Sequence, residues 1–380
     1  MKSLFMSQIR VRVVGAGFSG AVAARVLADH GAQVELWDKR DHIGGNAFDT
    51  PDAQGVWMHP YGPHIFHTQS QKVFDWLSRF TQWRSYEHRV KASVDGQLVP
   101  MPINRSTINQ LYGLALDSQG VEDFLASVRE PVVHPQNSEQ AVWACVGKDL
   151  CDRLYRGYTR KQWGRDLSEL SASVVTRIPV RTNDDDRYFT DTFQCMPQDG
   201  YTAMFGRMLD HPHISVHLNQ AFDSANPAHH EGCDALIYCG PVDAYFQHIY
   251  GALPYRSIRF EHVHHAAQDT HQPVAVVNFP NENAYTRVTE WKHITGQRCA
   301  GTTLTREYPS DEGEPFYPVP SDSSQRKFER YKALCETQDK VVFIGRLAEY
   351  RYYNMDQAVA SSLAKSTALA MKLGLMAEVV

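Results

Sequence analysis

A glycine-rich turn near the N-terminus carries the first chemical signal in this sequence. Gly15-Ala16-Gly17-Phe18-Ser19-Gly20 lies between the β-branched run Arg10–Val14 and the small, apolar run Ala21–Ala28. A second apolar run, Gln33–Trp37, ends at Asp38, about 20 residues beyond the last glycine. In a βαβ unit such glycines let a pyrophosphate approach the backbone, the helix N-terminus faces the phosphates, and the acid binds ribose hydroxyls. The pattern therefore predicts a dinucleotide-binding site.

A second glycine pair indicates which dinucleotide binds. Lys39-Arg40 and Ile43-Gly44-Gly45-Asn46 follow the acid. This extension resembles the fingerprint of FAD-binding proteins of the glutathione-reductase and amine-oxidase type, whereas an NAD site does not need the second pair. We therefore expect FAD rather than NAD, held by Gly15, Gly17, Phe18, Ser19, Gly20, Asp38, Lys39, Gly45 and Asn46.

Two late segments are predicted to return to the same sheet. Asp234–Cys239 and Lys340–Ile344 are short apolar runs followed by glycine, and Met355–Leu373 has apolar residues at helical spacing. Ligands of an open α/β sheet bind beyond the carboxyl ends of its strands. We therefore expect Gly345-Arg346 beside the cofactor, with the last helix directing its N-terminus at it. The alternative is one more βα unit without cofactor contact.

The middle of the chain has a different character. Periodicity favours helices over Thr107–Leu116, Val121–Val128, Ser138–Val146 and Lys148–Tyr158, antiparallel strands in Arg177–Phe193 and Ser257–Thr303, and a loop over Tyr308–Ser324. We expect an α/β fold with three parts. These are an FAD-binding Rossmann-type domain (1–80, 197–247 and 340–380), an inserted helical domain with a nucleotide-binding face (104–170), and an antiparallel β-sheet domain (81–103, 171–196 and 248–339).

One predicted helix face is a candidate for binding a planar base. Leu154, Tyr158 and Gln162 share a face at i, i+4 and i+8, and Tyr155 lies beside them. Aromatic side chains on such a face sandwich a flat ring, because stacking tolerates any base. The same spacing also fits a packed core.

Histidines, arginines and tyrosines supply the other candidates. His64 and His67 suit contacts to a flavin or a phosphate, structural hydrogen bonds, or a metal; without a further acid–histidine cluster we expect no metal. Guanidinium forks suit a diphosphate, although any single arginine is more often a surface residue. Tyr350–Met355 follows the predicted flavin turn, and its polar-tipped residues are poor core material. We expect a site role for this segment.

Composition restricts the classes of protein that remain. The 380 residues include 38 Lys and Arg against 43 Asp and Glu, so no basic excess suggests nucleic-acid binding. Seven cysteines without a CxxC pair fit reduced thiols, and no apolar run suggests a signal peptide or a membrane span. We expect a cytoplasmic protein. With no nucleophile elbow or paired carboxylates, its chemistry is expected to be the cofactor's own.

Motifs along nearly the whole chain resemble the bacterial UDP-galactopyranose mutase family. They are GAGFSG, RDHIGGNAF at 40–48, YGPHIFHT at 61–68, GYTRKQWG at 157–164, TRIPVR at 176–181, IYCGPVDAYF at 237–246, YRSIRFE at 255–261, AYTRVTE at 284–290, EPFYP at 314–318 and IGRLAEYRYYNMDQAV at 344–359. The GYTxKQWG and GRLAxYxYYxMD patterns are far more specific than GxGxxG.

The resemblance implies a redox-neutral flavin reaction. In this family, N5 of reduced FAD attacks the anomeric carbon of UDP-galactopyranose, the nucleotide leaves, and the flavin–sugar adduct opens as an iminium. The sugar recloses as a furanose and the nucleotide returns. Such nucleophilic catalysis divides one hard step into two easier ones. A flavin oxidoreductase of the amine-oxidase type, or a non-catalytic flavin-binding or nucleotide-binding protein, are the alternatives.

The resemblance also implies roles for individual residues. It assigns the diphosphate to Arg177 and Arg287, and the nucleotide and sugar to Tyr155, Tyr158, Thr159, Trp163, Tyr188, Asn278, His88, Tyr317 and Tyr352. It places His64, His67, Arg346, Tyr353 and Met355 near the flavin, and makes 170–183 a lid that carries Arg177. The residues it implies as catalytic are Arg177, Arg287, His67, Tyr317, Tyr352 and Asn354. A homodimer and an NADPH or NADH reductant are further expectations.

Two departures from the family pattern concern the sugar. Asn354 stands where relatives often have Asp, and Glu87 precedes His88 where relatives often have Asn. Relatives act on UDP-galactose, UDP-N-acetylgalactosamine, UDP-arabinopyranose or a TDP-linked fucose, and polar changes beside sugar hydroxyls discriminate among such substrates. The identity of the sugar therefore stays open at this point.

Overall fold

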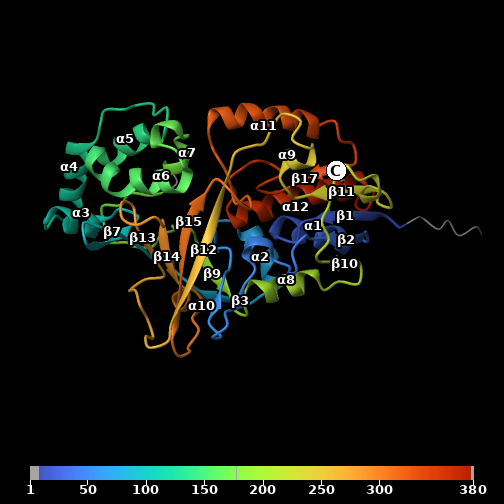
Figure 1. Cartoon of the computed structure of the whole chain (residues 1–380), viewed down its shortest axis with the longest axis horizontal. Coiled ribbons are helices and arrows are strands. Elements are labelled where there is room, and N and C mark those ends of the chain that lie inside the picture. Colours follow the sequence, from blue (N-terminus) through green and yellow to red (C-terminus); the bar gives the residue numbers. More distant parts are fainter. Residues whose placement is uncertain (1–7, 177, 378–380) are drawn as a thin grey trace, which may run out of the picture.

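A five-stranded parallel sheet carries the glycine-rich turn in the computed structural model, which describes residues 8–176 and 178–377 (Figure 1). The strand order is β10-β2-β1-β11-β17, and all neighbouring pairs are parallel. The strands are β1 (Arg10–Val14), β2 (Gln33–Trp37), β10 (Ile214–His217), β11 (Ala235–Tyr238) and β17 (Val341–Phe343). The predicted α/β class and the predicted strands of this sheet are confirmed.

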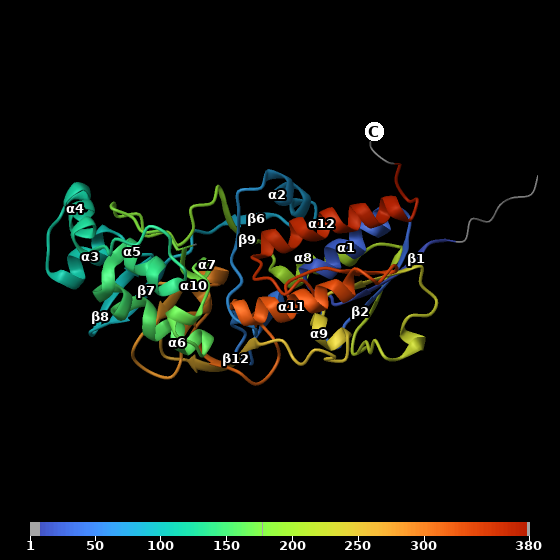
Figure 2. The same ribbon diagram turned by 90° about the horizontal axis from the view of Figure 1, so that it is seen from above.

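Two helices from opposite ends of the sequence pack together on this sheet. α1 (Phe18–Asp29) has a buried face of small residues, including Ala21, Ala24 and Ala28. Small side chains let α1 lie close to the sheet and to α12 (Met355–Lys372), and Figure 2 shows the two helices side by side. The predicted C-terminal helix is thereby confirmed and closes the unit that the N-terminus begins.

A seven-stranded sheet forms the middle of the molecule. Its order is β16-β12-β15-β14-β13-β7-β8, with all neighbours antiparallel except the parallel pair β13 and β7. The strands are β7 (Val90–Val94), β8 (Gln97–Met101), β12 (Tyr255–His265), β13 (Val276–Asn278), β14 (Arg287–Glu290), β15 (Thr302–Ser310) and β16 (Tyr317–Pro318). The antiparallel strands predicted within Ser257–Thr303 are confirmed.

Two small antiparallel sheets connect these parts. One has the order β5-β9-β6, built from β5 (Phe66–Thr68), β9 (Phe193–Pro197) and β6 (Trp83–Ser85). The other pairs β3 (Thr50–Pro51) with β4 (Trp57–Met58). The first of these sheets pairs β5, which carries His67, with β9, so that His67 lies opposite Gln194.

A helical unit lies at the end of the molecule opposite β1 and β2 in Figures 1 and 2. It contains α3 (Arg105–Tyr112), α4 (Ser118–Val128), α5 (Ser138–Leu150), the π-helical turn η2 (Cys151–Arg156), α6 (Gly157–Trp163) and α7 (Ser173–Thr176). Gly147 breaks α5 with φ 79°, where a Cβ would lie 2.4 Å from the Val128 carbonyl oxygen. The helix predicted over Lys148–Tyr158 is therefore three successive segments, one of them a π-turn.

The remaining helices are short or lie on the surface of the sheets. They are α2 (Gln71–Ser78), α8 (Tyr201–Leu209), α9 (Val242–Tyr245), α10 (Trp291–Thr295) and α11 (Asp322–Cys335), with 3-10 turns at Gly45–Ala47, Leu167–Glu169 and Pro227–His229. Within the described ranges, no helix has the length and apolar character needed to span a membrane.

Two predictions of local structure are wrong. The described part of Arg177–Phe193 is a loop that joins the sheet by one bridge, between Arg187 and Arg89, and β9 begins only at Phe193. Its turn-forming residues, and the Arg181 guanidinium bound to the carbonyls of Asp185 and Arg187, favour a folded-back loop. Conversely, the loop predicted over Tyr308–Ser324 includes β16 and the start of α11, because Tyr317 pairs with Arg256.

Candidate active site

The glycine-rich turn, the second glycine pair and the C-terminal Gly345 converge on one point. A Cβ on Gly45 would lie 2.8 Å from the Gly17 Cα, and a Cβ on Gly345 would lie 2.7 Å from the Ser19 Oγ. A Cβ on Gly20 would lie 1.8 Å from the Gly15 carbonyl oxygen. A larger residue at Gly20 or Gly45 would have to move backbone, and one at Gly345 would have to displace the Ser19 side chain, because real Cβ contacts are essentially never below 3.0 Å.

This cradle has the donors that a pyrophosphate needs. Gly17 is the N-cap of α1 and provides no side-chain cap, and the first turn has no acidic residue, so the first N–H groups of α1 remain available to an anion. Asp38 follows β2, and its carboxylate accepts from the Ala16 N–H at 2.7 Å and the Arg40 N–H at 2.9 Å. The residues present therefore fit the phosphates and a ribose of a dinucleotide.

A cavity of about 480 Å³ lies where the helical unit, the seven-stranded sheet and the loops around α12 meet. It is lined by fifteen of the side chains predicted for the site: His64, His67, His88, Tyr155, Tyr158, Thr159, Trp163, Tyr188, Asn278, Arg287, Tyr317, Arg346, Tyr352, Asn354 and Met355. These residues come from elements spread over most of the chain, so only the tertiary fold brings them together.

The wall from the helical unit is the predicted base-binding face. Leu154 and Tyr155 lie in the π-turn, Tyr158 and Gln162 lie in α6, and all four side chains line the cavity. The extra residue in a π-turn shifts the helix face locally, which is why π-turns are frequent at functional sites. Here the turn places Tyr155 and Tyr158 together on the cavity wall.

Arg287 supplies a cation to the opposite wall. It lies on β14 directly opposite Glu307 on β15, and its Nε is 2.8 Å from Glu307 Oε2. Glu307 is fully buried, whereas a quarter of the Arg287 side chain is exposed. Burial raises the pKa of Glu307, and the Arg287 guanidinium opposes that shift. The pair presents a guanidinium to the cavity, with its counter-ion buried beside it on the neighbouring strand.

A second arginine lies among aromatic rings at the carboxyl end of β17. The Arg346 Nη2 donates to the Tyr353 carbonyl at 2.6 Å, and its guanidinium carbon lies 5.1 Å from the Tyr317 ring and 5.3 Å from the Tyr352 ring. Tyr317 and Tyr352 stack with ring centroids 5.3 Å apart, beside Trp163. The arrangement is a flat, cationic surface of the kind that binds sugars and planar rings.

The three histidines of the cavity have different environments. Burial lowers the pKa of His64 and of His88 to about 3, so both are neutral at physiological pH. His64 Nδ1 lies 2.8 Å from the Gly62 carbonyl oxygen, and His88 Nδ1 lies 3.0 Å from the Tyr86 hydroxyl. His67 instead contacts a carboxylate, Asp191. No group of three metal-ligating side chains occurs in residues 8–176 and 178–377.

Comparison with known protein families identifies the family to which this cavity belongs. The model of the UDP-galactopyranose mutase family matches residues 153–352. The chain belongs to this family. A Rossmann-like NAD(P)-binding domain model matches residues 13–80, which contain the glycine cradle.

Relatives of the UDP-galactopyranose mutase family match nearly end to end. A probable UDP-galactopyranose mutase of Klebsiella pneumoniae is 39% identical over 94% of both chains. A dTDP-fucopyranose mutase of Escherichia coli is 36% identical over 93% of this chain and 96% of its own. A crystal structure of a reduced UDP-galactopyranose mutase has a TM-score of 0.74 at 18% identity, covering 98% of this chain and 97% of that one. Putrescine oxidase structures reach a TM-score of 0.57 at 15% identity, which is a likeness of fold alone.

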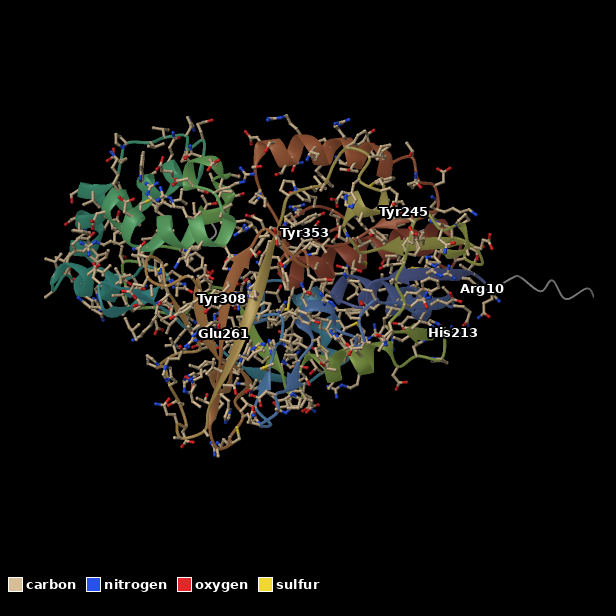
Figure 3. The ribbon with its side chains drawn as sticks, in the orientation of Figure 1. Arg10, His213, Tyr245, Glu261, Tyr308 and Tyr353 are labelled. Atoms are coloured by element: carbon tan, nitrogen blue, oxygen red, sulfur yellow. The ribbon has the colours of Figure 1, made fainter. Side chains whose placement is uncertain are left out.

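Some residues that the sequence predicts for the site lie outside the cavity. The Phe18 ring packs against Phe205 with centroids 4.8 Å apart, so only its backbone is available to a cofactor. Lys39 Nζ pairs with Glu314 at 2.5 Å. Tyr353 lies near the middle of the molecule in Figure 3 and its hydroxyl donates to Glu349 at 3.0 Å. Arg177 lies outside the described residues.

The two departures from the mutase family pattern have different positions. Asn354 lines the cavity at the start of α12, and its N–H donates to Gln357 Oε1 at 3.0 Å. Glu87 is not among the lining residues and pairs with Arg89 at 2.9 Å and with Arg187 at 3.4 Å. Of the two, only Asn354 is in a position to touch a ligand in this cavity.

Three acidic residues of this site were not identified from the sequence. Two line the cavity and the third pairs with Arg287. Glu307 lies behind Arg287, Asp191 contacts His67, and Asp356 lines the cavity beside Asn354. Asp356 Oδ2 accepts from Thr68 at 2.9 Å, while its buried Oδ1 has no hydrogen-bond partner among the described residues. Glu307 had a signal, since a carboxylate within a mostly buried strand needs a cation beside it. Asp191 had none, because its partner is far away in the sequence.

Proposed function

We propose that this chain interconverts the pyranose and furanose forms of a nucleotide-linked sugar, with FAD in its reduced form as cofactor. UDP-galactose is the first candidate substrate. The observation that carries the proposal is the shared cavity, in which an aromatic base-binding face, the Arg287 cation and the turn at Arg346 meet. Family membership supports the same activity.

FAD fits the cradle and the cavity together. The backbone of Gly15–Gly20 and the N-terminus of α1 would hold the pyrophosphate, and Asp38 the ribose, with Gly45 and Asn46 beside them. His64, Arg346 and Met355 would border the flavin. Reduced flavin, when bound, supplies the nucleophile that displaces the nucleotide from the anomeric carbon. Because the flavin is active only when reduced, a reductant such as NADPH or NADH is required.

The substrate would lie across the cavity from the helical unit to α12. Tyr155 and Tyr158 would stack on the base, with Thr159 and Asn278 at its edge, and Arg287 would keep the diphosphate near the anomeric carbon between departure and return. Charge stabilisation and proximity are the physical contributions of such a cation. The residues assigned to the sugar end are Trp163, His88, Tyr188, Tyr317, Tyr352 and Asn354.

Segment 170–183, which carries Arg177, would act as a lid over this cavity. Closure would exclude water, which hydrolyses reactive intermediates. Val174, Val175 and Ile178 of this segment already line the cavity, so it is in a position to cover a ligand. We further propose a cytoplasmic homodimer, which size-exclusion chromatography with light scattering would test.

A substrate panel tests the proposed function. Dithionite-reduced protein is incubated with UDP-galactopyranose, UDP-N-acetylgalactosamine, UDP-arabinopyranose and dTDP-fucopyranose, and the products are separated by ring size. We expect a furanose product from at least one substrate, and none from oxidised protein. The panel includes dTDP-fucopyranose for two reasons. One relative is a dTDP-fucopyranose mutase, and Asn354 places an amide at the cavity. No isomer from any substrate would refute the proposal, and oxygen uptake with an amine would favour an oxidase.

A further inference from the structure

A carboxylate holds His67 from a distant part of the chain. His67 Nδ1 on β5 lies 2.8 Å from Asp191 Oδ2, and both residues line the cavity. The imidazole stacks on Phe189 with ring centroids 3.6 Å apart and an interplanar angle of 13°. Their side chains are 12% and 21% exposed. With one nitrogen engaged and one face covered, Nε2 is the nitrogen left for a ligand.

The loop that carries Asp191 is anchored to the small sheet. His67 pairs with Gln194 across β5 and β9, and Gln194 Nε2 donates to the Asp191 carbonyl at 3.0 Å. On the other side, the Thr192 hydroxyl donates to Gln69 Oε1 at 2.8 Å. The carboxylate is therefore positioned before any ligand arrives, which is the condition for effective proton transfer.

Among the charged groups around the His67 imidazole, Asp191 is the one in direct contact with it. His88, from the chain before β7, is neutral because burial lowers its pKa to about 3. Arg287 on β14 is compensated by Glu307. Asp356 on α12 directs one oxygen at Thr68, the neighbour of His67. A carboxylate that accepts from Nδ1–H fixes the tautomer and strengthens Nε2 as a proton acceptor.

We propose that the His67–Asp191 pair moves the proton that ring exchange requires, an inference that rests on the proposed mutase function. When the pyranose opens, the bond between the anomeric carbon and the ring oxygen breaks with its electrons on the oxygen, which takes a proton from His67 Nε2. When the furanose closes, the C4 hydroxyl bonds to the anomeric carbon and returns its proton to Nε2. Asp191 stays ionised throughout and acts as the positioning residue.

Three variants test this role on the reduced holoenzyme. His67→Gln removes the proton carrier, and Asp191→Asn keeps the shape of the carboxylate but removes its charge. Asp29→Asn is the matched control, because Asp29 lies 3.7 Å from His211 in an aspartate–histidine pair that does not line the cavity. The visible FAD spectrum reports folding and cofactor binding in each variant. kcat and KM are measured between about pH 5.5 and 9, the range in which histidines titrate.

We expect kcat to fall about 100-fold or more in the His67→Gln and Asp191→Asn variants, with KM nearly unchanged. The fall of kcat with rising pH should vanish in His67→Gln. Asp29→Asn should match the parent. Wild-type kinetics in both cavity variants would overturn the proposal.

Nuclear magnetic resonance of the oxidised holoenzyme with ¹⁵N-labelled histidine gives a second readout, independent of turnover. The His67 signals are assigned by their absence in His67→Gln. We expect the Nδ1-protonated tautomer in the parent and loss of that preference in Asp191→Asn, because the carboxylate accepts at Nδ1; an unchanged tautomer in Asp191→Asn would contradict the inference. If the parent isomerises no sugar, the proposed function fails, whereas a working parent with unaffected variants refutes only the proton pair.

Discussion

Arg287 Nε lies 2.8 Å from Glu307 Oε2, and the carboxylate of this pair is completely buried beneath the cavity. Neither the Arg287 Nε nor the Glu307 oxygens make a well-aligned hydrogen bond within the described residues, so the contact is mainly electrostatic. The cation is therefore partly neutralised before a substrate arrives, and a diphosphate competes with Glu307 for it.

Replacing Glu307 by glutamine should weaken the fold and tighten nucleotide binding. Removing one partner of a buried ion pair costs about 3–5 kcal/mol, because the other charge is left uncompensated. UDP would restore that compensation, so we expect a lower Tm without ligand and a larger rise in Tm with UDP. Differential scanning fluorimetry measures both. Glu261→Gln, which breaks the more exposed pair with Arg306, is the control and should change stability by about 1 kcal/mol or less.

Gly20→Ala should abolish FAD binding. A Cβ at this position would lie 1.8 Å from the Gly15 carbonyl oxygen, so the turn that forms the cradle has to open. The ratio of flavin to protein absorbance after purification measures occupancy. Gly206→Ala on α8 is the matched control, because a Cβ there meets nothing within 4 Å. Full flavin content in Gly20→Ala would show that the cradle does not hold the cofactor.

Tyr158→Ala should lower the affinity for UDP by about 1–3 kcal/mol, the usual contribution of one aromatic ring stacked on a base. Isothermal titration calorimetry with the oxidised protein measures this without turnover. Tyr112→Ala, on α3, removes a ring of the same unit that donates to Asp149 and does not line the cavity. Equal affinities of the two variants would mean that the base binds elsewhere.

Glu290 should make stability depend on acid pH. Burial alone would raise its pKa, but hydrogen bonds from His293, Thr302 and two backbone N–H groups lower the pKa of Glu290 to about 2. A depressed carboxyl pKa stabilises the fold above the unfolded value of 4.5 and loses that effect as pH falls toward 2. The difference in unfolding free energy between the parent and Glu290→Gln should therefore be largest at neutral pH, on the order of 1–3 kcal/mol after solvent screening, and shrink below pH 4.5. A difference independent of pH, measured by urea unfolding, would rule this out.

The helical unit illustrates where local pattern reaches its limit. Spacing places Leu154, Tyr158 and Gln162 on one face, and they do line the cavity together. It does not reveal the π-turn at Cys151–Arg156, nor the break at Gly147, where the Val128 carbonyl oxygen lies 2.4 Å from a Cβ position. The same kind of pattern predicts strand in the loop before β9, whose turns are stabilised by side-chain contacts that spacing does not encode.

Local sequence pattern is enough to predict the parallel βαβ unit, its glycine cradle and the residue types of the site. These follow from contacts between near neighbours: strand, turn and helix are encoded within the first forty residues. The pairing of each acid in the site with its cation or imidazole depends on the tertiary structure. Glu307 meets Arg287 across a strand pair and Asp191 meets His67 across 124 residues, because the free energy of a buried charge depends on its neighbours in space.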